Sequence, residues 1–269
     1  MKRLSFDPSW PESWRYSFPY DELEVWGGLA NRGYAYQYAE RHRHALGLVA
    51  RAHRPPARVL DIAGAQGNFT LALAEAGYEV TWNDLRADLE GYVRLKHERG
   101  TVHYAPGNAF ELGFRECFEI VLITEVIEHV AHPDDFLRKA ATLVPPGGHI
   151  VMTTPNGRYF RNPLPRFFDC PDPSVFEAQQ FKPDADGHIF LLHPDEVPPL
   201  AAKAGLQLVE LRVYTNSLTG GCLGTGPLLK VLPRGLVEAG ERLTQRLPAA
   251  VRDSISTGLA ALFRRPAGA

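Results

Sequence analysis

The 269-residue chain has few cysteines and no excess of charge of either sign. Its three cysteines, Cys117, Cys170 and Cys222, are widely separated and form no CxxC pair, so a disulfide framework is not expected. Lysine and arginine total 29 against 31 acidic residues, which gives a net charge of −2 and no general attraction for phosphate backbones. We therefore expect a protein of a reducing compartment that does not bind nucleic acid.

Long apolar runs are also missing. The first 18 residues contain prolines and acids where a signal peptide would need an unbroken apolar stretch. No window approaches the run of about 18 apolar residues that marks a membrane-spanning helix. With 45% apolar and 22% charged residues, the composition is that of a folded protein. The expectation is a cytoplasmic protein without a transmembrane segment.

Short apolar runs alternate with amphipathic stretches from residue 57 onward. This rhythm is typical of βα units and predicts a doubly wound, mostly parallel α/β sheet with helices on both faces. The predicted strands cover 57–63, 78–84, 101–107, 119–124, 149–155, 206–214 and 256–265. The predicted helices cover 31–54, a segment ending at Gly77, 85–99, 133–144 and 195–204.

The chain divides into an aromatic and helical extension (1–56), a core (57–215) and a C-terminal insertion with a last strand (216–269). Residues 156–188 are too long for an ordinary connection and are predicted to form a lid over an acceptor. Between residues 227 and 247, leucines lie on one helical face and basic residues opposite. We expect this stripe to cover the core of its own domain, with contact to a membrane surface as the weaker alternative.

The most informative segment is VLDIAGAQGNF (59–69), in which a buried strand and an acid precede small residues and a helix. Small residues let the backbone amides of a helix N-terminus approach a polar ligand at the carboxyl edge of the sheet. An ordinary tight βα turn explains the segment equally well. It contains no G-x-G-x-x-G run, which argues against a dinucleotide-dependent oxidoreductase.

Asp84 closes the second predicted strand, 23 residues after Asp61. An acid at this spacing is placed to bind the hydroxyl groups of a ribose. Its alternative role is to cap the N-terminus of the helix predicted over 85–99.

These segments resemble class I S-adenosylmethionine-dependent methyltransferases, in particular the group related to ubiquinone-biosynthesis O-methyltransferases. The resemblance covers about residues 40–215 and includes VLDIAGAQGNF, TWND ending at Asp84, APGNAF (105–110) and ITEVIEHVAHPDDFL (123–137). It implies a seven-stranded Rossmann-like fold with S-adenosyl-L-methionine as cofactor. The cofactor-binding positions that it implies are Asp61, Ala63, Gly64, Ala65, Gly67, Asp84, Leu85, Asn108, Ala109, Thr124, Glu125 and Arg43, with Arg41 close to the last.

The chain departs from the family pattern at three of these positions. Ala63 and Ala65 stand where the family usually has glycines. Because alanine resists a positive φ, we expect either negative φ angles at both or a bend at Gly64 instead. Asn108 replaces the acid that faces the adenine, and its side-chain oxygen can still accept a hydrogen bond from the adenine amino group.

Glu125, Glu128 and His129 follow the fourth predicted strand, and the resemblance implicates this cluster in activity. In some relatives it is linked to a divalent metal; we expect none here, because the residues supply ligand types but no demonstrated geometry. His129 is predicted to be the base, oriented by one of the two glutamates, since imidazole suits removal of a hydroxyl proton. Packing under the cofactor is its alternative role. His188, with Asp186 near it, is predicted to return over the pocket as a further catalytic residue.

The predicted function is methyl transfer to a small-molecule acceptor, with a hydroxyl oxygen favoured. N- or C-methylation, methylation of nucleic acid or protein, and a non-catalytic cofactor-binding module are the alternatives. Methylation of nucleic-acid amino groups would favour an Asn/Asp-Pro-Pro-aromatic run where the chain has Thr124, Glu125, Val126 and Ile127. The sequence leaves open the acceptor and whether the chain forms a homo-oligomer.

Overall fold

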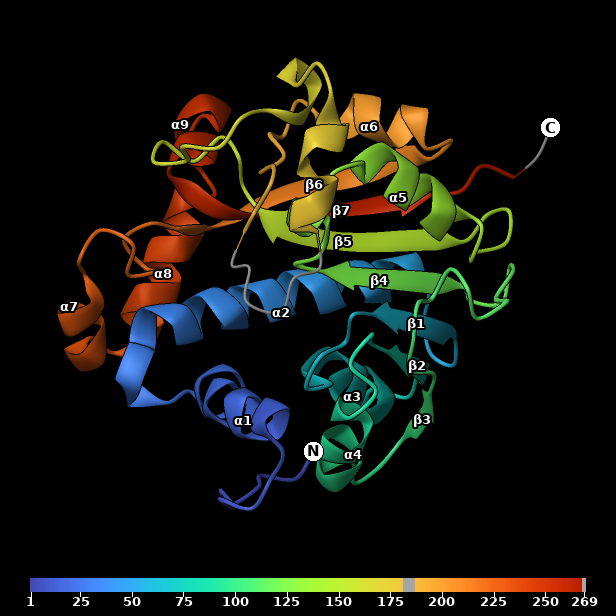
Figure 1. Ribbon diagram of the computed structural model, residues 1–269. Coiled ribbons are helices and arrows are strands. Elements are labelled where there is room, and N and C mark those ends of the chain that lie inside the picture. The colour runs from blue at the N-terminus through green and yellow to red at the C-terminus, as the bar shows by residue number, and fades with distance from the viewer. Residues whose placement is uncertain (181–186, 268–269) are drawn as a thin grey trace.

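The computed structural model describes residues 1–180 and 187–267 (Figure 1). In these residues a seven-stranded sheet has the order β3-β2-β1-β4-β5-β7-β6. Neighbouring strands are parallel except that β7 runs antiparallel to β5 and β6. The strands are β1 (Arg58–Ile62), β2 (Glu79–Asn83), β3 (Thr101–Tyr104), β4 (Ile120–Thr124), β5 (His149–Pro155), β6 (Gln207–Asn216) and β7 (Ser256–Arg264). The predicted mostly parallel, doubly wound α/β sheet is confirmed.

Helices cover both faces of this sheet. α2 (Arg32–Ala52) and α3 (Asn68–Glu75) lie on one face, while α5 (Pro133–Ala141) and α6 (Val197–Lys203) lie on the other (Figure 1). The other helices are α1 (Glu12–Glu24), α4 (Leu89–Lys96), α7 (Gly226–Val231), α8 (Arg234–Thr244) and α9 (Ala249–Ile255), with short 3₁₀ helices η1 (Leu29–Asn31), η2 (Ile127–His129), η3 (Phe167–Asp169) and η4 (Pro173–Gln179).

Strand β4 shows why the sheet has apolar residues on both faces. Val121 and Ile123 pack with the cluster beneath α5 and α6, whereas Ile120 and Leu122 pack with the cluster beneath α2 and α3. Successive side chains of a strand point to opposite faces, so a central strand covered on both sides becomes a continuous apolar run. The unbroken run in the sequence therefore predicted this central position correctly.

Helix α1 was not predicted. Its residues 12–24 include Pro19 and show little amphipathic pattern, and only Ser17 and Asp21 are buried. Contacts with the rest of the chain hold the segment instead: the rings of Trp10 and Trp14 each lie 5.8 Å from the ring of Tyr92 on α4. Tertiary packing thus overrides a weak local signal.

The leucine stripe of the C-terminal insertion does not cover the core, so that expectation was wrong. Leu228, Leu236 and Leu243 are 52%, 62% and 63% exposed. Helix α8 docks instead through Val237, which is buried against Tyr36, and through Glu241. The Glu241 carboxylate accepts from the backbone amides of Thr215 and Asn216 at 2.8 and 2.9 Å. A buried carboxylate keeps such hydrogen bonds because losing them would leave it unsolvated, and the leucines consequently face outward.

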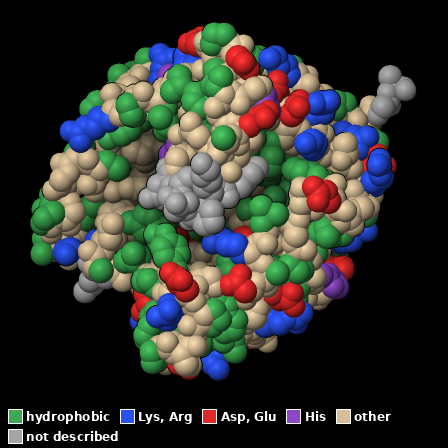
Figure 2. All heavy atoms as spheres, in the orientation of Figure 1, with side chains coloured by type: hydrophobic (Ala, Val, Ile, Leu, Met, Phe, Trp, Pro, Cys, Tyr) green, Lys and Arg blue, Asp and Glu red, His purple; other side chains and the backbone are tan. Residues whose placement is uncertain are grey.

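The face of the molecule seen in Figure 2 carries no single dominant charge. In the view of Figure 2, acidic and basic side chains are interspersed, in keeping with the net charge of −2. Among the described residues, no helix has the length and apolarity needed to cross a membrane.

The long insertion after β5 is anchored to the core by aromatic packing. Phe167 is buried, and its ring lies 5.4 Å from that of Phe190. Arg166 donates to Asp195 at 2.6 Å, next to the start of α6. Phe160, by contrast, is 55% exposed. The part of the predicted lid at 181–186, including Asp186, lies outside the described residues.

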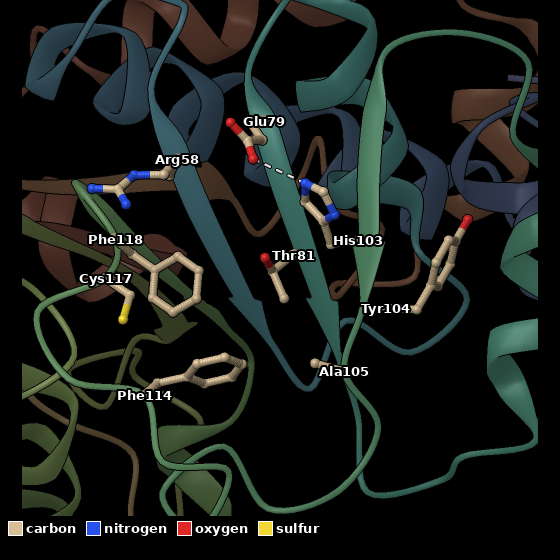
Figure 3. A pocket seen from close by; sticks show the side chains of 9 residues that line it. All are labelled: Arg58, Glu79, Thr81, His103, Tyr104, Ala105, Phe114, Cys117 and Phe118. Atoms are coloured by element: carbon tan, nitrogen blue, oxygen red, sulfur yellow. Dashed lines mark hydrogen bonds and ion pairs between the residues drawn. The ribbon is translucent and has the colours of Figure 1, made fainter.

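The connection between β3 and β4 contains turns and no helix, and a hollow of about 370 Å³ lies nearby on the sheet (Figure 3). Figure 3 shows His103 of β3 pointing toward Glu79 of β2, and their side chains form a hydrogen bond of 2.9 Å. None of the residues predicted to bind the cofactor lines this hollow. The candidate site lies elsewhere, at the carboxyl ends of β1, β2 and β4.

Candidate functional site

The loop between β1 and α3 has an unusual backbone. Ala63, Ala65 and Gly67 have φ angles of 56°, 46° and 75°, whereas Gly64 has no positive φ. Both alternatives expected for the alanines, negative φ or a bend at Gly64, were therefore wrong. The tight turn is maintained by hydrogen bonds from the Gly64 amide to the Asn83 carbonyl at 2.8 Å and from the Gly67 amide to the Gly64 carbonyl at 2.7 Å.

Gly64 is required for space rather than for its φ angle. A Cβ at this position would lie 2.7 Å from Cδ1 of Trp82 and 3.1 Å from a carboxylate oxygen of Asp61. The Trp82 indole cannot give way easily because it is fully buried and its Nε1 donates to the Ala65 carbonyl at 3.0 Å. The indole thus supports the loop, both by packing against Gly64 and by its hydrogen bond to Ala65.

Opposite effects are expected from two small substitutions in this loop. Gly64→Ala should destabilise the fold by about 1–3 kcal/mol, because it overpacks the space beside Trp82. Ala63→Gly should be neutral or stabilising by up to about 1 kcal/mol, because it removes the cost of a left-handed alanine but adds the chain entropy of glycine. Urea unfolding of both variants checks this pair. An equal loss of stability in both would show that the φ angles do not control the loop.

Asp84 binds the same loop from the end of β2. It is buried, and one carboxylate oxygen accepts from the Ala65 amide at 2.9 Å while the other accepts from the Arg86 amide at 2.9 Å. The half-exposed Arg86 guanidinium also pairs with it at 3.1 Å. Helix α4 begins only at Leu89, so the alternative role of Asp84 as its N-cap is wrong.

The loop after β3 is tied to the same edge through Asn83, which the sequence reasoning missed. Its side-chain amide donates to the carbonyls of Ala105 and Gly107 at 2.6 and 2.9 Å.

The side-chain oxygen of Asn108 accepts from the Phe110 amide at 3.1 Å, so an adenine amino group would have to share that oxygen. Of the neighbouring candidates, Ala109 is buried and Leu85 is 58% exposed.

Asp61 lies buried beneath the loop. One carboxylate oxygen accepts from the Thr70 hydroxyl at 2.6 Å, and the other has no hydrogen-bond partner among the described residues. Burial, and next the charge of Asp84, raise the pKa of Asp61 to about 7. A buried acid with an unused oxygen fits a site for a positively charged group, because such a group would stabilise the ionised form.

Glu125 follows Thr124 at the end of β4 and has a φ of 54°. Its carboxylate accepts from the Thr153 hydroxyl at 2.9 Å and pairs with Arg41 of α2 at 3.0 Å. Arg43 points elsewhere: it is 58% exposed and pairs with Glu40 on its own helix. Of the two arginines considered for this site, Arg41 is therefore the one that reaches the sheet edge.

Glu128, His129 and His188 come together although His188 belongs to a distant segment. Their ligand-type atoms lie within 4.8 Å of one another, and the two imidazole rings meet edge to face at 5.0 Å. The amide of Ile189 donates to the Glu128 carbonyl at 2.7 Å, which fixes the end of the insertion against η2. The predicted return of His188 to this edge agrees with the structure.

Glu128 is fully buried, and within the described part of the chain only one of its carboxylate oxygens is paired, with the Thr154 hydroxyl at 3.0 Å. Burial, and next the charge of Glu125, raise the pKa of Glu128 well above its usual range. A neutral glutamic acid beside two imidazoles can donate a hydrogen bond, which an ionised one cannot. One carboxylate and two imidazoles are also ligand types that a divalent cation accepts.

Comparisons with known proteins agree with this geometry. Residues 33–211 match the family model described as a methyltransferase domain. The ubiquinone biosynthesis O-methyltransferase of Burkholderia thailandensis is 32% identical over 204 residues, which cover 72% of this chain and 86% of that protein.

Solved structures show the same fold. An S-adenosylmethionine-dependent methyltransferase from Mesorhizobium loti aligns with a TM-score of 0.57 at 15% identity, over 88% of this chain and 100% of that one. A further one from Archaeoglobus fulgidus gives a TM-score of 0.56 at 15% identity, over 93% and 99%. With a loop shaped for close backbone approach and acids at the ends of β1 and β2, the chain belongs to the methyltransferase family and is an enzyme that uses S-adenosyl-L-methionine.

Proposed function

We propose that the enzyme transfers the methyl group to a hydroxyl oxygen of a small-molecule acceptor. The observation that carries the proposal is the imidazole pair of His129 and His188 beside Glu128, at the carboxyl end of β4. An oxygen acceptor must lose its proton as it is methylated, and imidazole is the side chain best suited to take it near neutral pH. The name of the Burkholderia relative supports oxygen as the acceptor atom.

The bound cofactor supplies an electrophilic methyl group on a sulfonium sulfur. The acceptor oxygen forms a bond to this methyl carbon as the carbon–sulfur bond breaks, and the hydroxyl proton passes to the His129 imidazole. Asp61, Asp84 and the loop between β1 and α3 would hold the cofactor, while Glu128 and His188 would keep His129 in place. Alignment of the reacting groups supplies the rest of the rate enhancement.

Residues 156–188 would form a wall around the acceptor. Phe160 and Arg161 lie at the exposed part of this segment. The buried Phe167 belongs to the core and has a structural role. Contact of residues 227–247 with a membrane surface stays a prediction, which the outward-facing leucines favour over their burial in the core.

The choice of acceptor atom can be tested with a matched pair of acceptors. Dihydroxybenzene and its diamino counterpart have the same ring and differ in the nucleophilic atom. With methyl-labelled S-adenosylmethionine, mass spectrometry should detect a methyl ether from the first and little product from the second. Preferential methylation of the amine would contradict the proposal and favour N-methylation.

A further inference from the structure

Lys96, at the end of α4, is a buried charge that joins three separate segments. Its side chain is 2% exposed. The ammonium group donates to both carboxylate oxygens of Asp21 on α1 at 2.8 Å. It also donates to the Gln66 carbonyl at 2.8 Å and to the side-chain oxygen of Asn68 at 2.6 Å. Gln66 and Asn68 flank Gly67 in the loop between β1 and α3. Lys96 therefore links α1 to that loop.

Glu24, the last residue of α1, contacts the same two loop residues. One of its carboxylate oxygens accepts from the side-chain amides of Gln66 and Asn68 at 2.8 and 2.9 Å. The other accepts from the Tyr34 hydroxyl at 2.6 Å. The loop is therefore held on both sides of Gly67 from one helix, directly by Glu24 and through Lys96 by Asp21.

The C-terminal half of helix α1 is also attached through Asp21, which accepts from the Tyr92 hydroxyl of α4 at 2.7 Å, and through Tyr20, whose ring lies 6.3 Å from that of Tyr34 on α2. The buried residues of α1 are only Ser17 and Asp21. The aromatic contacts of Trp10 and Trp14 attach the preceding segment and the first turn to α4. The attachment of Glu24 and the conformation of the loop thus depend on the same hydrogen bonds. A ligand that stabilises the loop must then also stabilise α1, because such coupling is reciprocal.

We propose that α1 is part of the cofactor site, with Asp21, Glu24 and Lys96 as positioning residues that hold the loop between β1 and α3 in its binding conformation. None of the three needs to touch the cofactor. They act through Gln66 and Asn68, and cofactor binding in turn fastens α1 to the body of the enzyme. The proposal rests on S-adenosylmethionine being the cofactor and is independent of the acceptor.

Glu24→Ala tests the proposal without removing any partner of the buried Lys96 ammonium. It leaves the amides of Gln66 and Asn68 without their shared acceptor, and we expect the affinity for S-adenosylhomocysteine to fall by about tenfold or more in calorimetry. Glu22→Ala is the matched control, because Glu22 lies on the same helix and pairs with the exposed Arg3. Glu24→Gln retains a carbonyl oxygen and should restore most of the affinity.

Two further readouts separate positioning from a general loss of stability. The thermal midpoints of Glu24→Ala and Glu22→Ala without ligand should be similar. Hydrogen exchange in residues 12–24 should slow when S-adenosylhomocysteine is added to the unaltered enzyme and to Glu22→Ala, and much less in Glu24→Ala.

Affinity of Glu24→Ala equal to that of Glu22→Ala would overturn the proposal, as would exchange in α1 that does not respond to the ligand. Failure of the unaltered enzyme to bind S-adenosylhomocysteine would overturn the cofactor assignment and this proposal with it.

Discussion

His129→Ala is expected to lower the rate of methyl transfer by about 10²–10⁴, the usual contribution of a general base. Cofactor affinity should stay within a few fold, because His129 faces His188 rather than the loop between β1 and α3. If an imidazole takes the proton, activity falls as the pH drops and the imidazole becomes protonated. His129→Ala should therefore also flatten the acidic limb of the pH profile of kcat. Single-turnover rates across pH measure both effects.

The neighbouring acid provides the control for this experiment. Because the pKa of Glu128 is raised, its own titration could also produce an acidic limb. Glu128→Gln keeps the size of the side chain and an oxygen for the Thr154 hydroxyl, and it should retain the limb. If a metal at this cluster were required, a chelator would abolish the methyl-transfer activity of the unaltered enzyme. Full activity in His129→Ala together with indifference to chelators would leave alignment alone as the mechanism.

Asp84→Ala is expected to weaken binding of S-adenosylmethionine and of its demethylated product by about 2–4 kcal/mol, which corresponds to the two charge-assisted hydrogen bonds that we predict Asp84 makes to the ribose. Calorimetry with the product measures this loss without turnover. Unchanged affinity would show that Asp84 does not contribute to cofactor binding.

Two variants show how much of that loss comes from the loop instead of the ribose. Asp84 also accepts from the Ala65 amide, so its removal loosens the loop. Asp84→Asn keeps an oxygen for that amide but loses the charge, and it should bind with intermediate affinity. Arg86→Ala removes the guanidinium that pairs with Asp84 and should leave affinity equal or higher, since the carboxylate no longer has to be shared.

Several features of the cofactor site could be predicted from local sequence. The acids at the ends of β1 and β2 and the small residues after β1 are adjacent in the chain or separated by one βα unit, so the fold brings them together in a regular way. The contacts of Lys96 gave no such signal. A lysine near the end of an amphipathic helix resembles a solvated residue, and its partner Asp21 is 75 residues away in a helix with little pattern.

The sequence by itself determined the sheet. Because both faces of the sheet are covered, β4 is a continuous apolar run, and the alternation of such runs with helices specifies a doubly wound α/β fold.

Tertiary structure alone decided two features, and both are the opposite of what the local sequence pattern predicts. The leucines of α8 face outward because Glu241 on the same helix satisfies the buried amides of Thr215 and Asn216. Ala63 and Ala65 adopt positive φ because the hydrogen bonds to Asn83 and Asp84 and the indole of Trp82 fix the path of the loop. In both cases satisfying buried polar groups outweighs a residue's intrinsic preference, since an unpaired buried group costs more than an exposed leucine or a strained alanine.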